Sequence, residues 1–515
     1  MNIVILDLSS FSFNDLNSSM LDKPDTIVLA LSPSAFYYLE LQKIDYISFH
    51  NLITVRQFSR DILKFYEEVL VLNQKNIYFK GFFRDIAQYV NYFYYIDTII
   101  DYIKTHNFDE IYYITDKKIM KNNILSNESS LLEEYIGFTK VIKLQKVNYK
   151  NIDKINIIKK YKFSSLLKKI RNKIFKTNLK YDWLHISPNI DKKSIKISSQ
   201  SIKFFLNKFQ YIKNKDLKFE IPEEYRKINP YQTFLTKDIY LHVLEYKKLQ
   251  QKLYFFQHGS YLYKNIFIKY AEVELSNINF VLNGYSKKLF EELGARKVYN
   301  VGSILFNQSI KEEPKEYDYL YITQGHDYTG SLNYVDFPNS LHSFDGHELY
   351  KRHKLTIELF GKQLKDKKIL IRVHPLVLNS GLYVPFWEIA APYPNVTIDV
   401  SIPIHTLIEK SKYIISDYFT TEFINRELHY KRDIILFKGA PTPLPEETME
   451  DMEKMFILVD VVDDLEEKVQ DIEKITKNRK RNDDIIEYYT SKKCNTKKVV
   501  IEIINKELEN EKRIY

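Results

Sequence analysis

The segment from Leu407 to Leu428 constrains the fold more than any other part of the chain. Its apolar, β-branched core, Tyr413 to Ile415, has the composition of a strand that is buried on both faces of a parallel sheet. Ser416 and Asp417 follow, and both side chains can cap a helix N-terminus. Because a helix that starts at the carboxyl end of a buried strand commonly binds an anion, the segment predicts an α/β fold with a phosphate site at this turn.

Three more polar residues, Thr420, Thr421 and Glu422, fall in the opening turns of the predicted helix. The hydroxyl groups of Ser416, Thr420 and Thr421 would add donors to the free backbone N–H groups, which suits a phosphate ester. We expect Glu422 to accept hydrogen bonds from the ribose hydroxyls of a nucleotide. The alternative is an ordinary capped helix, in which the Glu422 carboxylate only stabilises the helix dipole.

A second strand with a polar end precedes this one. Residues Lys368 to Leu376 read KILIRVHPL, and Pro375 should end the strand and leave His374 at its carboxyl end. Two successive βα units of one sheet place such ends along the same edge. We therefore predict that Arg372 and His374 hold the phosphate of an activated donor, the alternative being an ordinary strand end.

A chain of 515 residues is too long for a single core and fits two large domains. Strands and helices alternate along it, which favours parallel sheets wrapped by helices. Periodicity is weak between residues 302 and 318, so we place the domain boundary there. The predicted organisation is a Rossmann-like acceptor domain over residues 1–305, a Rossmann-like nucleotide-donor domain over 306–480 and a helical tail over 481–515, with the ligand between the two domains.

Composition excludes several classes of protein. The net charge of +9 is modest for this length, so nucleic acid is not an expected partner. Cys494 is the only cysteine, which excludes an intramolecular disulfide and a cysteine-based zinc site and favours the cytoplasm. Asp7 interrupts the N-terminal apolar run, which therefore predicts a first strand and not a signal peptide. No uninterrupted apolar segment approaches the length of a membrane span.

One segment, Lys159 to Lys180, carries nine Lys or Arg residues and no acid, with apolar residues at helical spacing. Such a charge run is commonly the solvated face of a helix. The other interpretation is a basic amphipathic helix on an anionic membrane surface, which would make the protein peripheral at the inner face of the cytoplasmic membrane.

A histidine follows another predicted strand, Lys252 to Phe256, which runs directly into Gln257, His258 and Gly259. Gly259 frees the backbone after the strand, and an unperturbed pKa near 6.5 lets a histidine accept a proton at neutral pH. We predict that His258 is the general base that deprotonates an acceptor hydroxyl, the alternative being a structural histidine.

Taken together, the order of these motifs resembles bacterial surface-polysaccharide glycosyltransferases of the GT-B fold. The nearest likeness is to transferases that use CMP-activated ulosonic acids such as sialic acid, its bacterial analogues or Kdo, and it covers roughly Phe255 to Gly439. The motifs that carry the resemblance are QHG (257–259), FVLNGYSKKLFEELGARKVYNVGS (280–303), LYITQG (320–325), RVHP (372–375) and SDYFTTE (416–422).

The resemblance implies roles for several residues. In sialyltransferases of this kind an HP motif and a later pair of hydroxyls meet the CMP phosphate, which here are His374 with Pro375, and Ser416 with Thr420 and Thr421. The predicted nucleotide- and phosphate-binding set is Gln324, Gly325, Arg372, His374, Pro375, Ser416, Asp417, Thr420, Thr421 and Glu422. The implied partners are a CMP-linked donor and a glycan, lipid-linked or protein acceptor, with no other cofactor and no metal.

The chain departs from that family in its Thr-Thr pair and in lacking a clear Asp/Glu-Asp/Glu-Gly base motif. Its SDY element also resembles CDP-glycerol and CDP-ribitol phosphotransferases of teichoic acid synthesis, which carry an HG motif in their first domain. Three hypotheses therefore stay open: a CMP-ulosonate glycosyltransferase, inverting with a His base; a CDP-alditol phosphotransferase; and a binding protein without turnover.

Overall fold

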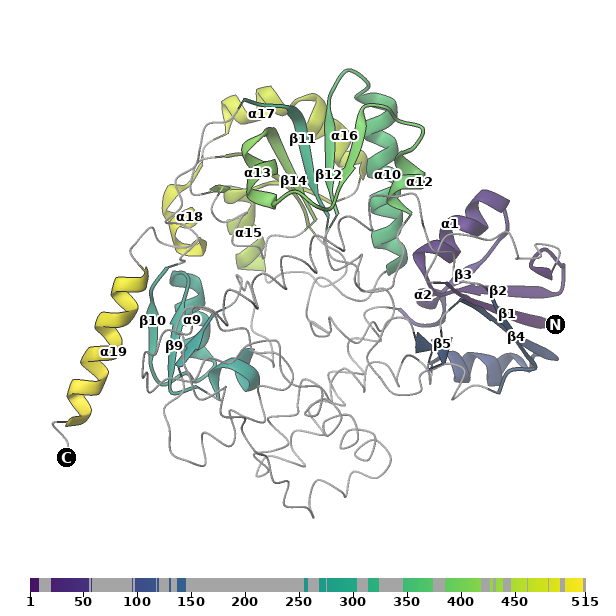
Figure 1. Ribbon diagram of the computed structural model, residues 1–515, viewed down its shortest axis with the longest axis horizontal. Helices are drawn as coiled ribbons and strands as arrows, with labels where there is room; N and C mark the ends of the chain where they lie inside the picture. Colours follow the sequence, from purple (N-terminus) through teal and green to yellow (C-terminus); the bar gives the residue numbers. More distant parts are fainter. Residues whose placement is uncertain are drawn as a thin grey trace, which may run out of the picture.

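The computed structural model describes parts of residues 1–144 and most of the chain from residue 254 onward (Figure 1). The described residues are 1–8, 20–54, 57, 95, 98–116, 118–119, 129–130, 137–144, 254–257, 268–274, 276–302, 314–323, 346–373, 385–417, 427–428, 432–438, 446–460, 462–479, 481–490 and 496–512. They form an α/β protein whose described strand pairs are all parallel, so the predicted fold class of helices around parallel sheets is confirmed.

Near the N-terminus five parallel strands form a sheet in the order β3-β2-β1-β4-β7. The strand bounds are β1 Asn2–Asp7, β2 Thr26–Ala30, β3 Ile47–Ser48, β4 Glu110–Thr115 and β7 Lys140–Lys143. Helix α1, Pro33–Gln42, packs on this sheet through Ala35, Phe36 and Leu39, and Ser32 caps it by accepting a hydrogen bond from the Ala35 N–H. Short elements nearby are α2 Phe49–Leu52, β5 Lys118–Ile119 and β6 Ser129–Ser130.

The second large sheet has six parallel strands in the order β13-β12-β11-β14-β15-β16. The strand bounds are β11 Tyr317–Ile322, β12 Ile369–Arg372, β13 Val396–Asp399, β14 Ser411–Ser416, β15 Ile434–Phe437 and β16 Ile457–Val459. Its first strand, β11, lies in the interior with later strands added on both sides. This is the strand order of a doubly wound Rossmann-like sheet.

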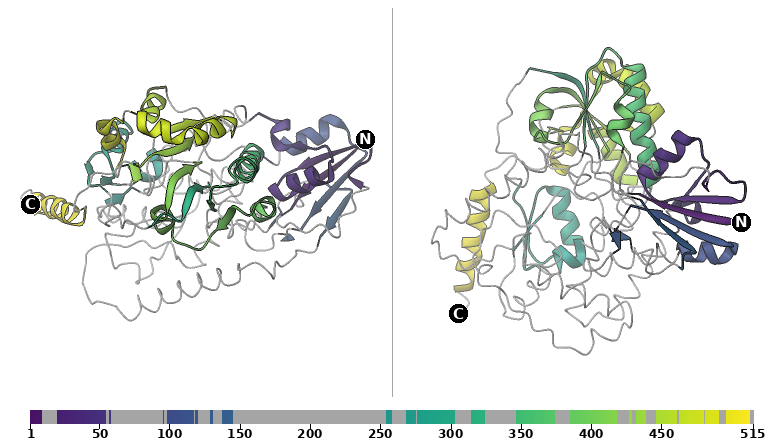
Figure 2. Two further views of the ribbon diagram at one scale, coloured as in Figure 1. Left: turned by 90° about the horizontal axis from the view of Figure 1, so that it is seen from above. Right: turned by 45° about the vertical axis from the view of Figure 1, so that its right-hand side comes forward.

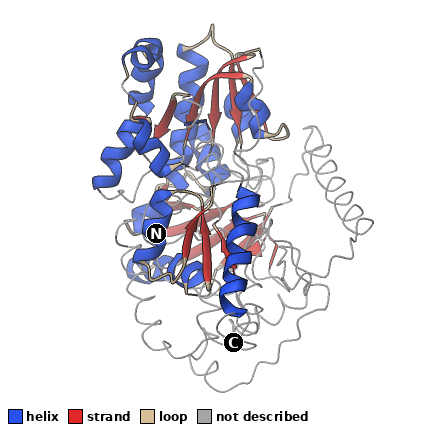
Figure 3. Ribbon diagram, turned by 90° about the vertical axis from the view of Figure 1, so that its left-hand side faces the viewer, coloured by secondary structure: helices blue, strands red, loops and turns tan. Residues whose placement is uncertain are grey.

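Helices cover both faces of the six-stranded sheet (Figure 3). Along β11, Tyr319 and Tyr321 pack against one set of helices, while Leu320 and Ile322 pack against the other, because successive side chains of a strand point to opposite faces. Burial on both faces explains the apolar runs of these strands. The helices are α10 Gly346–Gln363, α12 Phe386–Ala390 and α16 Val462–Gln470 on the first face, and α13 Ile404–Glu409, α15 Glu446–Met455 and α18 Asp483–Tyr489 on the second.

A three-stranded parallel sheet, in the order β10-β9-β8, is completed by the end of the chain. Val500 and Ile504 of the last helix, α19, pack against Ile278 and Phe280 of β9, and Figure 3 shows this helix beside the strands. The predicted helical tail is thus confirmed. The element bounds are β8 Tyr254–Phe256, the π-helix Ile268–Val273, β9 Ile278–Val281, α9 Gly284–Glu292, β10 Val298–Asn300, α17 Ile472–Asn478 and α19 Thr496–Lys512.

In two places the structure differs from the sequence expectations. The apolar spacing near residues 465–475 predicts one helix, whereas the structure has two, α16 and α17, which meet at Asp471. Strand β13 and its flanking helices α12 and α13 were not expected, because each is too short to show a clear period. The predicted basic segment 159–180 lies outside the described residues. The predicted domain boundaries stay predictions. None of the described helices is long and apolar enough to cross a membrane.

Candidate functional site

The candidate site is the carboxyl edge of the six-stranded sheet, at the position where its strand order reverses. Strands β11 and β14 are neighbours there, and Ile322 pairs with Ser416 on one side and with Arg372 on the other, which in turn pairs with Asp399. We call this row, Asp399–Arg372–Ile322–Ser416, the rim. Open α/β sheets bind ligands outside the carboxyl ends of their strands at such a reversal. Two predicted site residues, Arg372 and Ser416, therefore lie on one rim.

At Thr323, Val373 and Asp417 the chain leaves the described rim, and each of these residues directly precedes a stretch that was predicted to bind the nucleotide. Those stretches lie outside the described residues, as does the predicted base. The residues concerned are Gln324, Gly325, His374, Pro375, Thr420, Thr421, Glu422 and His258. Their roles stay predictions.

Asp417 is fully buried at the end of β14 and is bound from two elements. Its Oδ1 accepts a hydrogen bond from the Tyr321 hydroxyl at 2.8 Å, and its Oδ2 lies 2.6 Å from Nε2 of His353 on α10. Arg352 is 3.7 Å from Oδ1. Burial alone would raise the pKa of the Asp417 carboxyl, but the charges and hydrogen bonds of His353, Arg352 and Tyr321 outweigh it and leave that pKa lowered. Asp417 is therefore an ionised anchor for α10.

Because the Asp417 carboxylate faces α10, a direct contact with a nucleotide phosphate stays a prediction, and one that charge repulsion would oppose. The described contacts show instead that Asp417 connects the end of β14 to α10. Tyr321 takes part in the same network. Burial and the adjacent Asp417 carboxylate raise the pKa of the Tyr321 phenol far above its usual value, so the phenol stays a donor.

Arg372, at the end of β12, is also buried, and its Nη1 lies 3.3 Å from Asp399. Asp399 in turn accepts hydrogen bonds from the Ser401 hydroxyl and backbone N–H and from the Ile402 N–H. The guanidinium group is thereby fixed at the rim. A planar guanidinium carries five donors, so Arg372 has the chemistry to bind an anion, and its predicted role at the phosphate remains open to test.

Sequence reasoning did not identify Tyr321, Arg352 or His353 as part of the site. Tyr321 has the periodicity of a core residue in a strand, and His353 that of a core residue in a helix. Arg352 also stacks its guanidinium group over the Phe437 ring, 4.9 Å from the centroid. One sequence feature could have pointed to this network. It is the pair of adjacent basic residues, Arg352 and His353, in the helix after a strand that ends at the rim.

The five-stranded sheet has the same reversal of order, between β1 and β4, and two carboxylates lie at its carboxyl edge. Asp7 ends β1 and pairs in register with Thr115, and Asp116 follows directly; both aspartates are buried. The Tyr113 hydroxyl donates to Asp7 at 3.1 Å. Sequence reasoning used Asp7 only to exclude a signal peptide and missed Asp116. Within the described part of the chain, no cluster of three or more His, Cys, Asp or Glu side chains is arranged to hold a metal ion.

The described residues form an α/β protein with two large parallel sheets, and polar side chains lie at the carboxyl edge of each where its strand order reverses. No protein-family model matches the chain, and no curated protein sequence matches it. Solved structures do resemble it, at low identity. One is the UDP-GlcNAc 2-epimerase from Neisseria meningitidis bound to UDP-GlcNAc, with 14% identity, a TM-score of 0.40, and coverage of 69% of this chain and 96% of that chain.

Two further solved structures are similar at the same distant level. A UDP-N-acetylglucosamine 2-epimerase from Listeria monocytogenes has 12% identity and a TM-score of 0.36, over 53% of this chain and 73% of that chain. The calicheamicin glycosyltransferase has 10% identity and a TM-score of 0.29, over 98% of this chain and 97% of that chain. With TM-scores below 0.5, these likenesses carry no argument about the chemistry of this chain, which has to come from its own residues.

Proposed function

We propose that this protein is a GT-B glycosyltransferase that moves a sialic acid-like or Kdo-type ulosonic acid from a CMP-activated donor to a hydroxyl group of a surface glycan or glycoprotein. The observation that supports this most is the register of the rim, which aligns Arg372 with Ser416 across β11 at the reversal of strand order. Both stretches that resemble phosphate-binding motifs of CMP-sugar transferases, 372–375 and 416–422, thus begin on this row.

In the proposed reaction the donor phosphate sits at the rim. Arg372, His374 and the hydroxyl of Ser416 hold the phosphate and stabilise the charge that CMP gains as it leaves. The bond between the anomeric carbon and the phosphate oxygen breaks, and the acceptor oxygen bonds to the opposite face of that carbon, which inverts its configuration. His258 takes the proton of the acceptor hydroxyl. Glu422 holds the ribose.

The five-stranded sheet offers a second source for the base. Asp7 and Asp116 lie at the edge where that sheet reverses its order, and a buried carboxylate can act as a general base as well as a histidine can. They are the candidates to test if His258 proves structural.

A second candidate function is supported by the SDY sequence at residues 416–418, which resembles CDP-glycerol and CDP-ribitol phosphotransferases. The same rim would then hold a CDP-linked alditol, and the acceptor oxygen would attack phosphorus instead of carbon. Donor binding at the rim would be common to both reactions, so nucleotide binding alone does not separate them.

Two measurements test the proposal. A thermal-shift screen with CMP, CDP, UDP and GDP should show the largest stabilisation with CMP, because a ligand that binds only the folded state raises its melting temperature. Product analysis with CMP-sugars and with CDP-glycerol then separates the two reactions. Transfer from CDP-glycerol alone would replace the first candidate by the second, and binding of CMP without turnover on either donor would favour a binding protein.

For location, we propose the inner face of the cytoplasmic membrane, with residues 159–180 bound to anionic lipid. Each basic residue close to an anionic surface contributes about 1 kcal/mol, so partial engagement of the nine cationic residues of this segment would be enough to localise the chain.

A further inference from the structure

Helix α10 touches the five-stranded sheet's helix α1 as well as its own sheet. Glu40, on α1, accepts hydrogen bonds at Oε2 from the Tyr350 hydroxyl (2.9 Å) and from Lys354 Nζ (2.6 Å), both on α10. At Oε1 it accepts from the Tyr46 hydroxyl (3.1 Å), which also lies 2.9 Å from Nε2 of His347. One carboxylate therefore joins three turns of α10, directly or through Tyr46, to the neighbouring unit.

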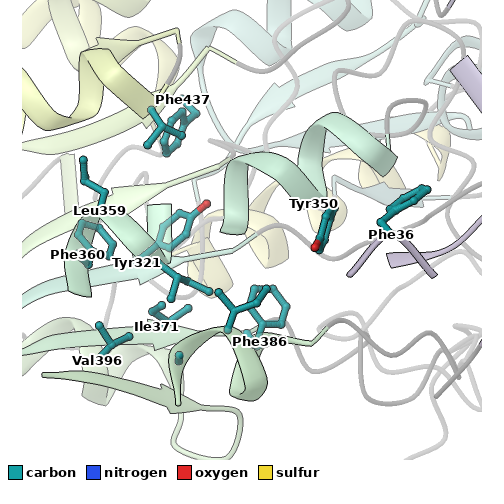
Figure 4. Packing of buried hydrophobic residues seen from close by; sticks show 14 of the residues in the cluster. Phe36, Tyr321, Tyr350, Leu359, Phe360, Ile371, Phe386, Val396 and Phe437 are labelled. Atoms are coloured by element: carbon teal, nitrogen blue, oxygen red, sulfur yellow. The ribbon is translucent and has the colours of Figure 1, made fainter. Parts of the chain in front are cut away.

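Aromatic packing surrounds this carboxylate. The Phe36 ring lies 4.7 Å from the His347 ring and 5.6 Å from the Tyr350 ring, centroid to centroid, and Figure 4 shows Phe36 and Tyr350 side by side between α1 and α10. Through these rings the apolar cores of the two large sheets form a single cluster. Figures 1 and 2 show α1, in purple, beside the green α10. The contact is thus a packed interface that excludes water from part of the ion pair.

The adjacent side of α10 carries the anchor to the rim. His353 and Arg352 bind Asp417, which directly follows Ser416. Lys354, which binds Glu40, is the next residue after His353. Two carboxylates, Glu40 on α1 and Asp417 after β14, therefore bind consecutive residues of one helix. The His353–Asp417 pair has no exposed side-chain surface on either partner, so α10 cannot move relative to the rim without leaving a buried charge unpaired, which is strongly unfavourable.

We propose that Glu40 is a positioning residue for the donor site, although it lies on α1: by holding α10 it fixes the turn at Ser416 and Asp417 in the geometry that binds the nucleotide. This inference rests on the proposed function of the rim. The physical basis is that α10 is one continuous helix of 18 residues with ionic contacts on both sides, so a shift at one contact moves the other. Coupling of this kind is reciprocal, so nucleotide at the rim should also tighten the contact between α1 and α10.

The first test measures CMP affinity by calorimetry. Glu40→Gln should weaken CMP binding about five- to tenfold, at the lower end of the range for coupled sites, although Glu40 is not expected to touch the nucleotide. The matched control is Glu291→Gln, which removes a carboxylate from an exposed i,i+4 pair with Lys287 on α9 and should leave CMP affinity unchanged.

The second test does not need the nucleotide. Hydrogen exchange of the backbone amides over residues 411–417 should become faster in Glu40→Gln than in the parent and the control, because the turn loses its fixed support. If Glu40 only stabilised its own helix, Glu40→Gln would speed exchange around residues 33–42 and leave exchange at 411–417 unchanged. That result would overturn the inference. If Glu40→Gln fails to fold, Tyr350→Phe removes one hydrogen bond to the same carboxylate and should shift exchange at 411–417 in the same direction.

The two tests separate the inference from the proposed function. A parent protein that binds neither CMP nor CDP would refute the nucleotide assignment, whereas hydrogen exchange would still report the coupling through α10. A parent that binds CMP, together with Glu40→Gln of equal affinity and unchanged exchange at 411–417, would refute the coupling and leave the nucleotide assignment intact.

Discussion

Replacing Asp417 by Asn should destabilise the protein more than any other conservative change at the rim. The substitution keeps the shape of the side chain but removes the charge that holds His353, Arg352 and the Tyr321 hydroxyl. Breaking a buried ion pair by removing one partner costs about 3–5 kcal/mol, because the partners that remain are buried without the group that offset their loss of hydration. Since Asp417 and His353 have no exposed side-chain surface, we expect a loss of about that size in the free energy of unfolding.

The pH dependence has a definite sign. The folded-state pKa of Asp417 is lowered, so its contribution to stability is fully present above the unfolded-state value of about 3.9 and is lost as the pH falls through the lower, folded-state pKa. The parent should therefore lose stability on acidification over a range that begins near that unfolded value, and Asp417→Asn should lose less, because it lacks this contribution at every pH.

A urea titration followed by tryptophan fluorescence measures both effects. The chain has two tryptophans, Trp183 and Trp387, and Trp387 on α12 packs against the core beside α10. In a Trp183→Phe background the signal therefore reports the unfolding of the six-stranded sheet and its helices. Asp366→Asn, at an exposed position just after α10, is the matched control and should change the free energy of unfolding by less than about 0.5 kcal/mol.

If Asp417→Asn unfolded at the same urea concentration as the control at neutral pH, the Asp417 carboxylate would not stabilise the fold as expected. Such a result would mean that water or a neighbouring group solvates His353 and Arg352 when the carboxylate is absent. An equal acid sensitivity of Asp417→Asn and the parent would refute the pKa argument separately, since the acid loss would then come from other carboxylates.

Further predictions concern the nucleotide, the base and the membrane. His374→Ala should weaken CMP binding by roughly ten- to a hundredfold, the worth of a charge-assisted contact to a phosphate, and calorimetry showing parental affinity would remove it from the site. Glu422→Gln should weaken nucleotide binding without changing the melting temperature, whereas a lower melting temperature with unchanged affinity would assign it to the helix dipole. His258→Ala should lower turnover by about 10²–10⁴-fold at near-parental nucleotide affinity; retained turnover would move the base elsewhere, with Asp7 and Asp116 the next to test. Sedimentation at low salt should be greater with anionic than with neutral vesicles, and equal sedimentation would make residues 159–180 a solvated segment.

The strands of both large sheets were largely predictable from the sequence, because burial on both faces requires apolar runs, such as Ile369 to Ile371 in β12 and Tyr413 to Ile415 in β14. The position of Arg372 and Ser416 on one edge followed from parallel βα order alone. Strand β13 was not predictable, since its four residues, VTID, are too few to show a clear period.

The network around Asp417 could not be read from the sequence for a different reason. Its partners Tyr321, Arg352 and His353 come from a strand and a helix far from it along the chain, and only the pairing of β11 with β14 brings them together. A single sequence shows what a residue could do at the end of a strand, such as capping a helix. It does not show that His353 of α10 already binds the Asp417 carboxylate.

The last helix, α19, covers a sheet whose strands lie much earlier in the chain. Ile278 and Phe280 of the three-stranded sheet are covered by Val500 and Ile504, and Lys297 and Tyr299 both bind Glu507. Because a ribosome makes the chain from the N-terminus, Val500 and Ile504 can cover that apolar face only after the entire six-stranded sheet has been synthesised. A chain that stops before Thr496 would release it to water, where exposed apolar surface favours aggregation. Loss of α19 should accordingly affect the early three-stranded sheet of β8, β9 and β10 before the six-stranded sheet that is synthesised after it.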